Sequence, residues 1–258
     1  MSAHESADSS SDWDAATYDR VADPQTRWGI AVLDRLPLEG DETVIDAGCG
    51  TGRVTQHLLR GLPRGRVVAL DASAAMLEEA RRRLAGDDRV RFVHANLLSF
   101  TDRDIGDAAP VDAVFSTATF HWVLDHGRLF ANLAAVLRPG GRLVAQCGAR
   151  GNIDGLTAVV RSLGVERPGT WFYASADDTV IRLEEAGFVD IDVWINKEPT
   201  PFDTTQELRD FLEAVCVREA VATMDDRERE GFLNALVARM PERVIDYVRL
   251  NIVAVRGP

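Results

Sequence analysis

Short runs of β-branched and apolar residues alternate with helical patterns over the first two thirds of the chain, and this alternation restricts the fold more than any other feature. The predicted strands occupy residues 43–46, 66–70, 90–94, 111–115 and 142–146. The predicted helices lie at about 52–61, 74–85 and 126–137, and the last of them ends at Pro139-Gly140-Gly141. Strands joined through helices require right-handed crossovers, which place helices on both faces of a mostly parallel sheet. The expected fold class is α/β, doubly wound and Rossmann-like.

The pattern changes at the two ends of the chain. Residues 13–36 are predicted to form helices that are interrupted near Pro24. Beyond Ala149 the predicted helices are 154–163, 177–187, 205–221 and 226–239, and the predicted strands are 189–195 and 244–255. We interpret residues 200–240 as a helical insertion over the strand ends of one sheet, where open α/β sheets bind their ligands.

The chain is acidic, with 29 Lys and Arg residues against 41 Asp and Glu residues and a formal net charge of −12. The excess is local, because residues 177–230 carry 16 acidic and 6 basic side chains whereas residues 21–176 are balanced. Nucleic acids and anionic membranes are bound through clustered Lys and Arg, so neither is an expected partner. A small molecule is the expected partner, and the oligomeric state is left open.

The three cysteines, Cys49, Cys147 and Cys216, lie far apart and match no metal-binding or disulfide pattern. The first 16 residues lack the apolar and basic regions of a secretion or transit signal. No run of 18 uncharged apolar residues is present to cross a membrane. We therefore expect a cytoplasmic protein without a metal site.

The segment VIDAGCGTG, residues 44–52, joins a predicted strand to a predicted helix through three glycines. Glycine allows a tight turn with positive φ and lets a ligand approach the backbone closely. The helix that follows directs unpaired N–H groups and the positive end of its dipole toward the turn. These features predict a site for a nucleotide-like ligand.

The spacing of the glycines restricts the class of nucleotide. The dinucleotide fingerprint G-x-G-x-x-G would require glycine where this chain has Arg53, and the Lys-Ser/Thr pair of a P-loop is missing. Asp71 ends the second predicted strand, where an acidic residue accepts hydrogen bonds from ribose hydroxyls. The turn therefore favours an adenosine ligand without a pyrophosphate over a nicotinamide dinucleotide.

These residues resemble the class I S-adenosylmethionine-dependent methyltransferases. VIDAGCGTGRVT and Asp71 carry the similarity, together with ANLLSF, VDAVFSTATFHWVLD and LRPGGRLVAQCG. Within that superfamily, the WDAATYD and FHW segments and the helical insertion are similar to the trans-aconitate methyltransferase-like group. The resemblance implies a seven-stranded sheet with an antiparallel last strand, and S-adenosyl-L-methionine as the cofactor. It also implies one domain at 13–258 after a disordered tail at 1–12, divided into a cofactor-binding core at 13–150 and substrate-side elements at 151–258.

The resemblance assigns cofactor-binding roles residue by residue. Asp46, Gly48 and Gly50 would hold the methionine end, Gly52 would open the following helix, and Asp71 would bind the ribose. The other candidates for cofactor binding are Cys49, Ala72, Met76, Asn96, Leu97 and Ser116. Asn96 stands where the family usually has Asp, and its carbonyl oxygen can still accept from the adenine amino group.

The candidate catalytic residues are His121 and Tyr18. His121 would act as a general base or a hydrogen-bond donor, and Tyr18 would close the site over the methionine end of the cofactor. The alternative for each is ordinary packing. The candidates for substrate binding are Thr117, Trp122, Arg150, Trp171 and Tyr173, with packing or surface exposure as the alternative.

Methyl transfer from a sulfonium is an in-line displacement that depends on alignment and on exclusion of water. A carboxylate acceptor is ionised at neutral pH, whereas a phenol with a pKa of about 10 benefits from a base. The resemblance favours methylation of a carboxylate oxygen on a small molecule. The alternatives are O-, N- or C-methylation of another specialised metabolite, and a non-catalytic cofactor-binding protein of the same fold.

Overall fold

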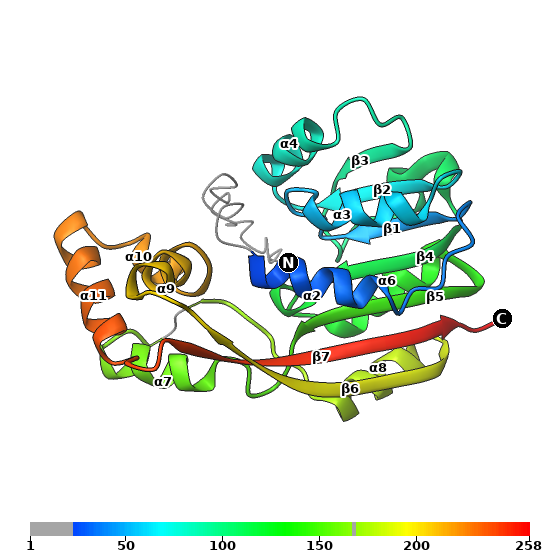
Figure 1. The fold of residues 1–258 in the computed structure, drawn as a ribbon. Coiled ribbons are helices and arrows are strands. Elements are labelled where there is room, and N and C mark those ends of the chain that lie inside the picture. Colours follow the sequence, from blue (N-terminus) through cyan, green and yellow to red (C-terminus); the bar gives the residue numbers. More distant parts are fainter. Residues whose placement is uncertain (1–22, 167–168) are drawn as a thin grey trace, which may run out of the picture.

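The computed structural model describes residues 23–166 and 169–258, and a seven-stranded sheet runs through them in the order β3-β2-β1-β4-β5-β7-β6 (Figure 1). The strands are β1 Thr43–Ala47, β2 Arg66–Asp71, β3 Val90–His94, β4 Val111–Thr117, β5 Leu137–Gly148, β6 Phe188–Pro201 and β7 Val244–Arg256. The pairs among β1 to β5 are parallel, and β7 is antiparallel to both β5 and β6. The predicted fold class and the antiparallel last strand are confirmed.

Helices cover both faces of the sheet. They are α2 Asp23–Leu33, α3 Arg53–Leu58, α4 Ala74–Arg83, α5 Asp102–Ile105, α6 His126–Val136, α7 Asp154–Ser162, α8 Ala176–Glu185, α9 Thr205–Phe211, α10 Arg218–Val221 and α11 Asp226–Ala238. Helices α2, α3 and α4 pack on one face, and α5, α6 and α8 pack on the other. Ser73 and Asp125 begin α4 and α6, because each side chain accepts a hydrogen bond from a backbone N–H of the first turn.

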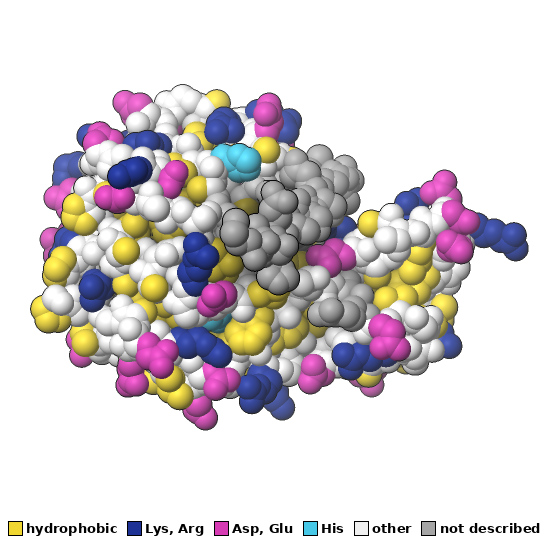
Figure 2. Space-filling view, turned by 180° about the vertical axis from the view of Figure 1, so that it is seen from behind, with side chains coloured by type: hydrophobic (Ala, Val, Ile, Leu, Met, Phe, Trp, Pro, Cys, Tyr) yellow, Lys and Arg dark blue, Asp and Glu magenta, His cyan; other side chains and the backbone are white. Residues whose placement is uncertain are grey.

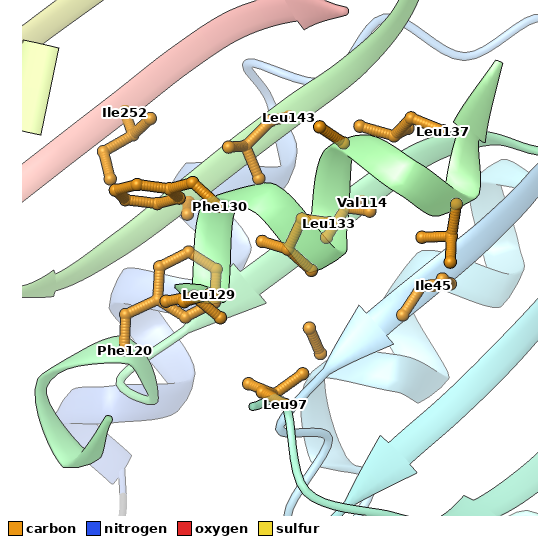
Figure 3. Packing of buried hydrophobic residues seen from close by; sticks show 14 of the residues in the cluster. Ile45, Leu97, Val114, Phe120, Leu129, Phe130, Leu133, Leu137, Leu143 and Ile252 are labelled. Atoms are coloured by element: carbon orange, nitrogen blue, oxygen red, sulfur yellow. The ribbon is translucent and has the colours of Figure 1, made fainter. Parts of the chain in front are cut away.

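The strands direct alternate side chains into two apolar cores, as the period of two requires. Val44 and Phe115 are buried against α2 and α3, whereas Ile45 and Val114 are buried against α6. Figure 3 shows the second core, in which Leu133 of α6 lies beside the strand residues. The sheet therefore fixes the ends of β1, β2 and β4 relative to one another.

The strands β6 and β7 run beyond the carboxyl ends of the parallel strands and carry α9, α10 and α11 between them (Figure 1). A separate apolar cluster joins these helices to α7 and the start of β7, with Phe211, Leu233 and Tyr247 buried in it. Figure 2 shows this helical insertion as a lobe that stands out from the body that contains the sheet. The predicted helical insertion before the last strand is confirmed.

Three elements differ clearly from their predicted bounds. β5 begins at Leu137 rather than 142, because Leu137 already pairs with Val111 of β4, so Pro139-Gly140-Gly141 lies within the strand. β6 extends to Pro201 rather than 195, because an edge strand tolerates Pro199 and Pro201, which cannot donate to a neighbouring strand. The predicted helix at 205–221 is divided by a π-helical turn at Leu212–Cys216. Helical periodicity continues through such a turn in the sequence, so the interruption was not visible there.

Candidate functional site

The three glycines of the turn after β1 all have positive φ, 81° at Gly48, 53° at Gly50 and 78° at Gly52. The N–H groups of Gly48 and Cys49 both donate to the carbonyl oxygen of Leu70, at 2.8 and 3.0 Å. These bonds fasten the turn to the end of β2. The predicted passage from strand through glycine turn to helix is present.

The turn is enclosed at one glycine and open at the next. A Cβ built on Gly48 would lie 2.2 Å from the side chain of Thr119, whose hydroxyl oxygen is 3.2 Å from the Gly48 carbonyl oxygen. A Cβ built on Gly50 would meet no atom of the described residues within 4 Å. The backbone at Gly50 is therefore accessible, as a cradle for the methionine end of S-adenosylmethionine requires.

Two carboxyl groups flank the turn, and Asp46 is buried whereas Asp71 is half-buried. Asp46 accepts from the Thr55 hydroxyl at 2.6 Å, and Asp71 accepts from the N–H groups of Gly50 at 2.8 Å and Ser73 at 2.9 Å. Burial raises the pKa of both carboxyls, that of Asp46 to about 7 despite the opposing hydrogen bond from Thr55. Each carboxylate oxygen has a further lone pair, so both residues fit the amino group and ribose hydroxyls of the cofactor.

Cofactor affinity should depend on the ionisation of Asp46. Below pH 7 the carboxyl is protonated and cannot pair with a cationic amino group, so the Kd for S-adenosylhomocysteine should rise by up to about tenfold per pH unit and level off above pH 7. In the unliganded protein the raised pKa makes folding less favourable as the pH rises. The unfolded carboxyl loses its proton first, so the free energy of unfolding should fall by up to about 4 kcal/mol as the pH rises from 4 through 7.

Calorimetric titration between about pH 5.5 and 8.5 measures the affinity, and urea unfolding between about pH 4 and 8 measures the stability. Asp46→Asn is the matched control, because it should bind weakly at every pH and remove both dependences. A Kd that does not change with pH in the wild-type protein would contradict the assignment.

Cys49 and Ser116 support the turn through the backbone. The Ser116 hydroxyl donates to the carbonyl of Ala47 at 2.6 Å and ties the end of β4 to the end of β1. Burial raises the pKa of the Cys49 thiol well above its usual value, so the thiol remains protonated. Contact of these two residues with the cofactor stays a prediction.

Ala72, Met76, Asn96 and Leu97 follow the ends of β2 and β3. These strands are parallel neighbours, so the four residues lie at the same edge of the sheet. Met76 and Leu97 are buried, whereas Ala72 and Asn96 are exposed. The side-chain oxygen Oδ1 of Asn96 accepts from the Leu98 N–H at 2.9 Å and keeps a second lone pair for a ligand. Their roles also stay predictions.

A small pocket, partly open to solvent, lies beside the segment that follows β4. Its walls come from widely separated parts of the chain: Gln25, Ala118, His121, Trp122, Asn152, Ile153, Trp171, Tyr173, Val215, Cys216, Tyr247 and Arg249. Thr119, which contacts Gly48, is the neighbour of Ala118 in this segment. The pocket therefore adjoins the glycine turn.

The backbone around the pocket departs from regular geometry in three places. Ile153 has a φ of 53°, which is rare and unfavourable for a β-branched residue. Ala118 has a φ of 54°. The π-helical turn at Leu212–Cys216 places Val215 and Cys216 in the pocket wall. Such departures concentrate at functional sites, and here they support a binding role for the pocket.

His121 is buried in the pocket wall and accepts a hydrogen bond there. The Gly148 N–H donates to His121 Nδ1 at 3.3 Å, so the neutral ring carries its proton on Nε2. Burial lowers the pKa of His121 well below its usual value, and the positive charge of Arg249 lowers it further. At neutral pH His121 is therefore an uncharged hydrogen-bond donor.

Three of the predicted substrate-binding residues line this pocket. The Trp171 ring stacks on Tyr173 with 5.8 Å between centroids and meets Trp122 edge-on at 5.9 Å. Burial raises the pKa of the Tyr173 hydroxyl, which is hydrogen-bonded to Asn152. Together the rings form an apolar wall beside His121, whose ring centroid is 5.2 Å from that of Trp122.

Other predicted residues lie elsewhere. Arg150 is exposed and donates to Asp178 at 3.1 Å, away from the pocket lining. Thr117 ends β4 outside the pocket lining, and its carbonyl accepts from the Thr119 hydroxyl at 2.9 Å. Tyr18 and the predicted tail at 1–12 fall outside the described residues.

Arg249 and Asn152 are pocket residues that sequence reasoning missed. Arg249 lies on β7, is 2% exposed, and has its Cζ 4.7 Å from the centroid of the Trp28 ring. The side-chain oxygen Oδ1 of Asn152 accepts from the Val248 N–H at 2.9 Å. One signal was available, since Arg249 and Asn251 place polar groups at alternate positions of a strand that has neighbours on both sides.

This strand order, with a glycine turn after β1 and an acidic residue ending β2, is typical of methyltransferases, and the comparisons agree. A family model described as a methyltransferase domain matches residues 44–141. Phosphoethanolamine N-methyltransferase 2 of Haemonchus contortus, solved with S-adenosylhomocysteine, superposes with a TM-score of 0.63 at 17% identity, covering 95% of this chain and 57% of that chain. Geranyl diphosphate C-methyltransferase of Streptomyces coelicolor A3(2) superposes with a TM-score of 0.55 at 22% identity, covering 90% and 76%.

Two relatives of about 30% identity cover most of the chain, so the chain belongs to the class I S-adenosylmethionine-dependent methyltransferases that act on small molecules. Trans-aconitate 2-methyltransferase of Acidovorax ebreus is 31% identical over 271 residues, covering 96% of this chain and 99% of the relative. The protein of the same name from Methylobacterium radiotolerans is 32% identical over 239 residues, covering 87% of each. The predicted resemblance to this group is confirmed.

Neither a membrane helix nor a metal cluster is found in residues 23–166 and 169–258. No helix in these ranges has the length and apolar character needed to span a bilayer. The same ranges contain no group of three His, Cys, Asp or Glu side chains placed to hold a metal ion.

Proposed function

We propose that this enzyme transfers the methyl group of S-adenosylmethionine to a carboxylate oxygen of a small organic acid. The hydrogen bond from the Gly148 N–H to His121 Nδ1 carries the proposal. Because this bond places the ring proton on Nε2, His121 offers a donor to the pocket and not a base. An acceptor that must lose a proton would need a base, whereas a carboxylate is already ionised.

The chemistry then requires little beyond alignment. S-adenosylmethionine supplies a methyl group on a positively charged sulfur. The carboxylate oxygen bonds to the methyl carbon while the carbon–sulfur bond breaks, and the products are a methyl ester and a neutral thioether. The His121 Nε2–H would orient the carboxylate, and the wall formed by Trp122, Trp171 and Tyr173 would exclude water.

The relatives support the same class of acceptor. Proteins named trans-aconitate 2-methyltransferase match nearly the whole chain at about 30% identity. We therefore propose a carboxylic acid as the acceptor class, and trans-aconitate belongs in the first panel of candidates.

The purified protein, methyl-labelled S-adenosylmethionine and a panel of small acids test the proposal. Each acid is paired with its amide and with the corresponding alcohol. Acids should become labelled, and mild alkali should release the label as methanol because esters are hydrolysed. Labelling that survives alkali, or equal labelling of the alcohols, would overturn carboxylate methylation.

Replacement of His121 separates a donor from a base. His121→Ala should lower kcat/KM for the acid by about 10- to 100-fold, the usual loss for one hydrogen bond to a charged group. His121→Gln retains an N–H donor of similar reach and should recover part of the rate. The wild-type profile of kcat against pH should be flat from pH 6 to 8.5, because the pKa of His121 lies well below its usual value. An ionisation near neutral pH that vanishes in both variants would assign a general base instead.

A further inference from the structure

We propose that Arg249 selects the acceptor by binding a carboxylate that is not methylated, and that Gln146 and Asn251 hold its guanidinium in place. The proposal rests on the function proposed above and adds a second anionic group to the acceptor. The observations behind this proposal are the contacts of Arg249 on the sheet face covered by α2.

The charge that the described residues present to the pocket is positive. Among the described residues that line it, Arg249 is the one side chain with a formal charge at neutral pH. Burial raises the pKa of Cys216 to about 12 and raises the pKa values of Tyr173 and Tyr247, so these groups stay neutral, as does His121. A guanidinium stays charged at all physiological pH values, and burial reduces screening of that charge by water. Arg249 therefore offers a charged hydrogen-bond donor to an anionic group of a ligand.

Arg249 and His121 are held at one position of the sheet. Arg249 pairs with Gly148 across β5 and β7, and the same Gly148 donates its N–H to His121. A Cβ on Gly148 would lie 2.5 Å from the Tyr173 ring, so the pocket wall closes directly on this backbone. The cation and the neutral donor are thus placed for two polar groups of one small molecule.

A buried polar network restricts the guanidinium. Arg249 Nε donates to the side-chain oxygen of Gln146 at 3.5 Å. The Gln146 side-chain amide in turn donates to the side-chain oxygen Oδ1 of Asn251 at 2.8 Å. Arg35 donates to the same oxygen at 2.5 Å, and the Trp28 ring covers the Arg249 guanidinium. Gln146 and Asn251 are at most 4% exposed. Such contacts limit the orientations of Arg249 before a ligand arrives, which favours paired hydrogen bonds to a carboxylate.

The chemistry of the reaction decides which carboxylate each group binds. Paired hydrogen bonds from a guanidinium stabilise the negative charge of a carboxylate and therefore reduce its tendency to attack. The single N–H of His121 is a weaker interaction and suits the reacting group. Arg249 is accordingly assigned to the carboxylate that remains free in the product.

Matched acceptors test Arg249. A four- or five-carbon dicarboxylic acid is compared with its mono-amide, which keeps one carboxylate. Arg249→Met should lower kcat/KM for the di-acid by about 10- to 100-fold, mainly through KM, and change that for the mono-amide less than threefold. Arg249→Lys should be intermediate because a point charge lacks the paired geometry. Arg142→Met, an exposed arginine on β5, is the control and should behave as wild type.

Variants of Gln146 test the network without removing the cation. Gln146→Glu gives Arg249 an internal carboxylate of the same size and should raise the KM for the di-acid more than Gln146→Leu does. Neither variant should alter the KM for the mono-amide or the affinity for S-adenosylhomocysteine. A merely structural role would instead lower the rates with both acceptors equally.

Binding distinguishes failure of this proposal from failure of carboxylate methylation. The di-acid is titrated into the complex with S-adenosylhomocysteine, where no turnover occurs. Binding that weakens by about 10- to 100-fold in Arg249→Met supports the site even if no acid is esterified. Equal binding by wild type and Arg249→Met, or no binding by either, would overturn it.

Discussion

Replacing Gly48 with alanine should raise the Kd for S-adenosylhomocysteine by at least about 100-fold. Two effects add. The residue has a φ of 81°, a conformation that costs an L-residue with a Cβ about 1 to 2 kcal/mol. The new Cβ would also lie 2.2 Å from the Thr119 side chain, so either the turn or the segment after β4 must move. Both parts border the cofactor site, and calorimetric titration measures the loss.

Gly86→Ala is the matched control. Gly86 has a φ of 87°, and a Cβ there would meet nothing within 4 Å. It follows α4 near the start of β3, at the opposite end of the sheet from the glycine turn. This variant should lose a similar amount of stability through backbone strain and bind the ligand normally. Wild-type affinity in Gly48→Ala would show that the turn tolerates a side chain and would remove its role as a cradle.

Phe130→Ala should lower the free energy of unfolding by about 3 to 5 kcal/mol, the usual loss for a large aromatic residue in a core. Phe130 lies on α6, is fully buried, and meets the Phe120 ring edge-on with 6.1 Å between centroids. The cavity would open between α6 and the sheet (Figure 3). For a chain of this size the Tm should fall by roughly 10 °C.

Urea unfolding monitored by circular dichroism measures the loss of stability. Leu124→Ala, at a side chain that is 57% exposed, is the control and should change the free energy of unfolding by less than about 0.5 kcal/mol. A loss of less than about 1 kcal/mol in Phe130→Ala would mean that α6 is not packed as described.

Local patterns predicted the sheet and the glycine turn. Strand periodicity located β1 and β2 to within one residue, and the glycine spacing located the turn after β1. These features depend on neighbours in the sequence, so they can be read from short windows. β6 was predicted too short because its pairing with β7, and not its own composition, keeps Pro199 extended.

The pocket could be predicted only in part. His121 was predicted because it follows the fourth strand, and Trp171 and Tyr173 were predicted because they belong to one aromatic cluster. Arg249 was not predicted from its position, because its burial depends on Trp28, more than 200 positions away in the chain. Contacts of this kind arise from tertiary packing, and their trace in the sequence is limited to the polar alternation of Arg249 and Asn251 on an inner strand.

The ends of the helical insertion lie next to each other. Pro201, the last residue of β6, pairs with Val244, the first residue of β7. The 42 residues between them therefore leave and re-enter the sheet as a long hairpin loop does. Lengthening such a loop costs little, since closure entropy grows only with the logarithm of its length. A foreign segment could therefore be grafted between these two adjacent junctions, provided that it covers the apolar surface that α7 and the start of β7 present to the insertion.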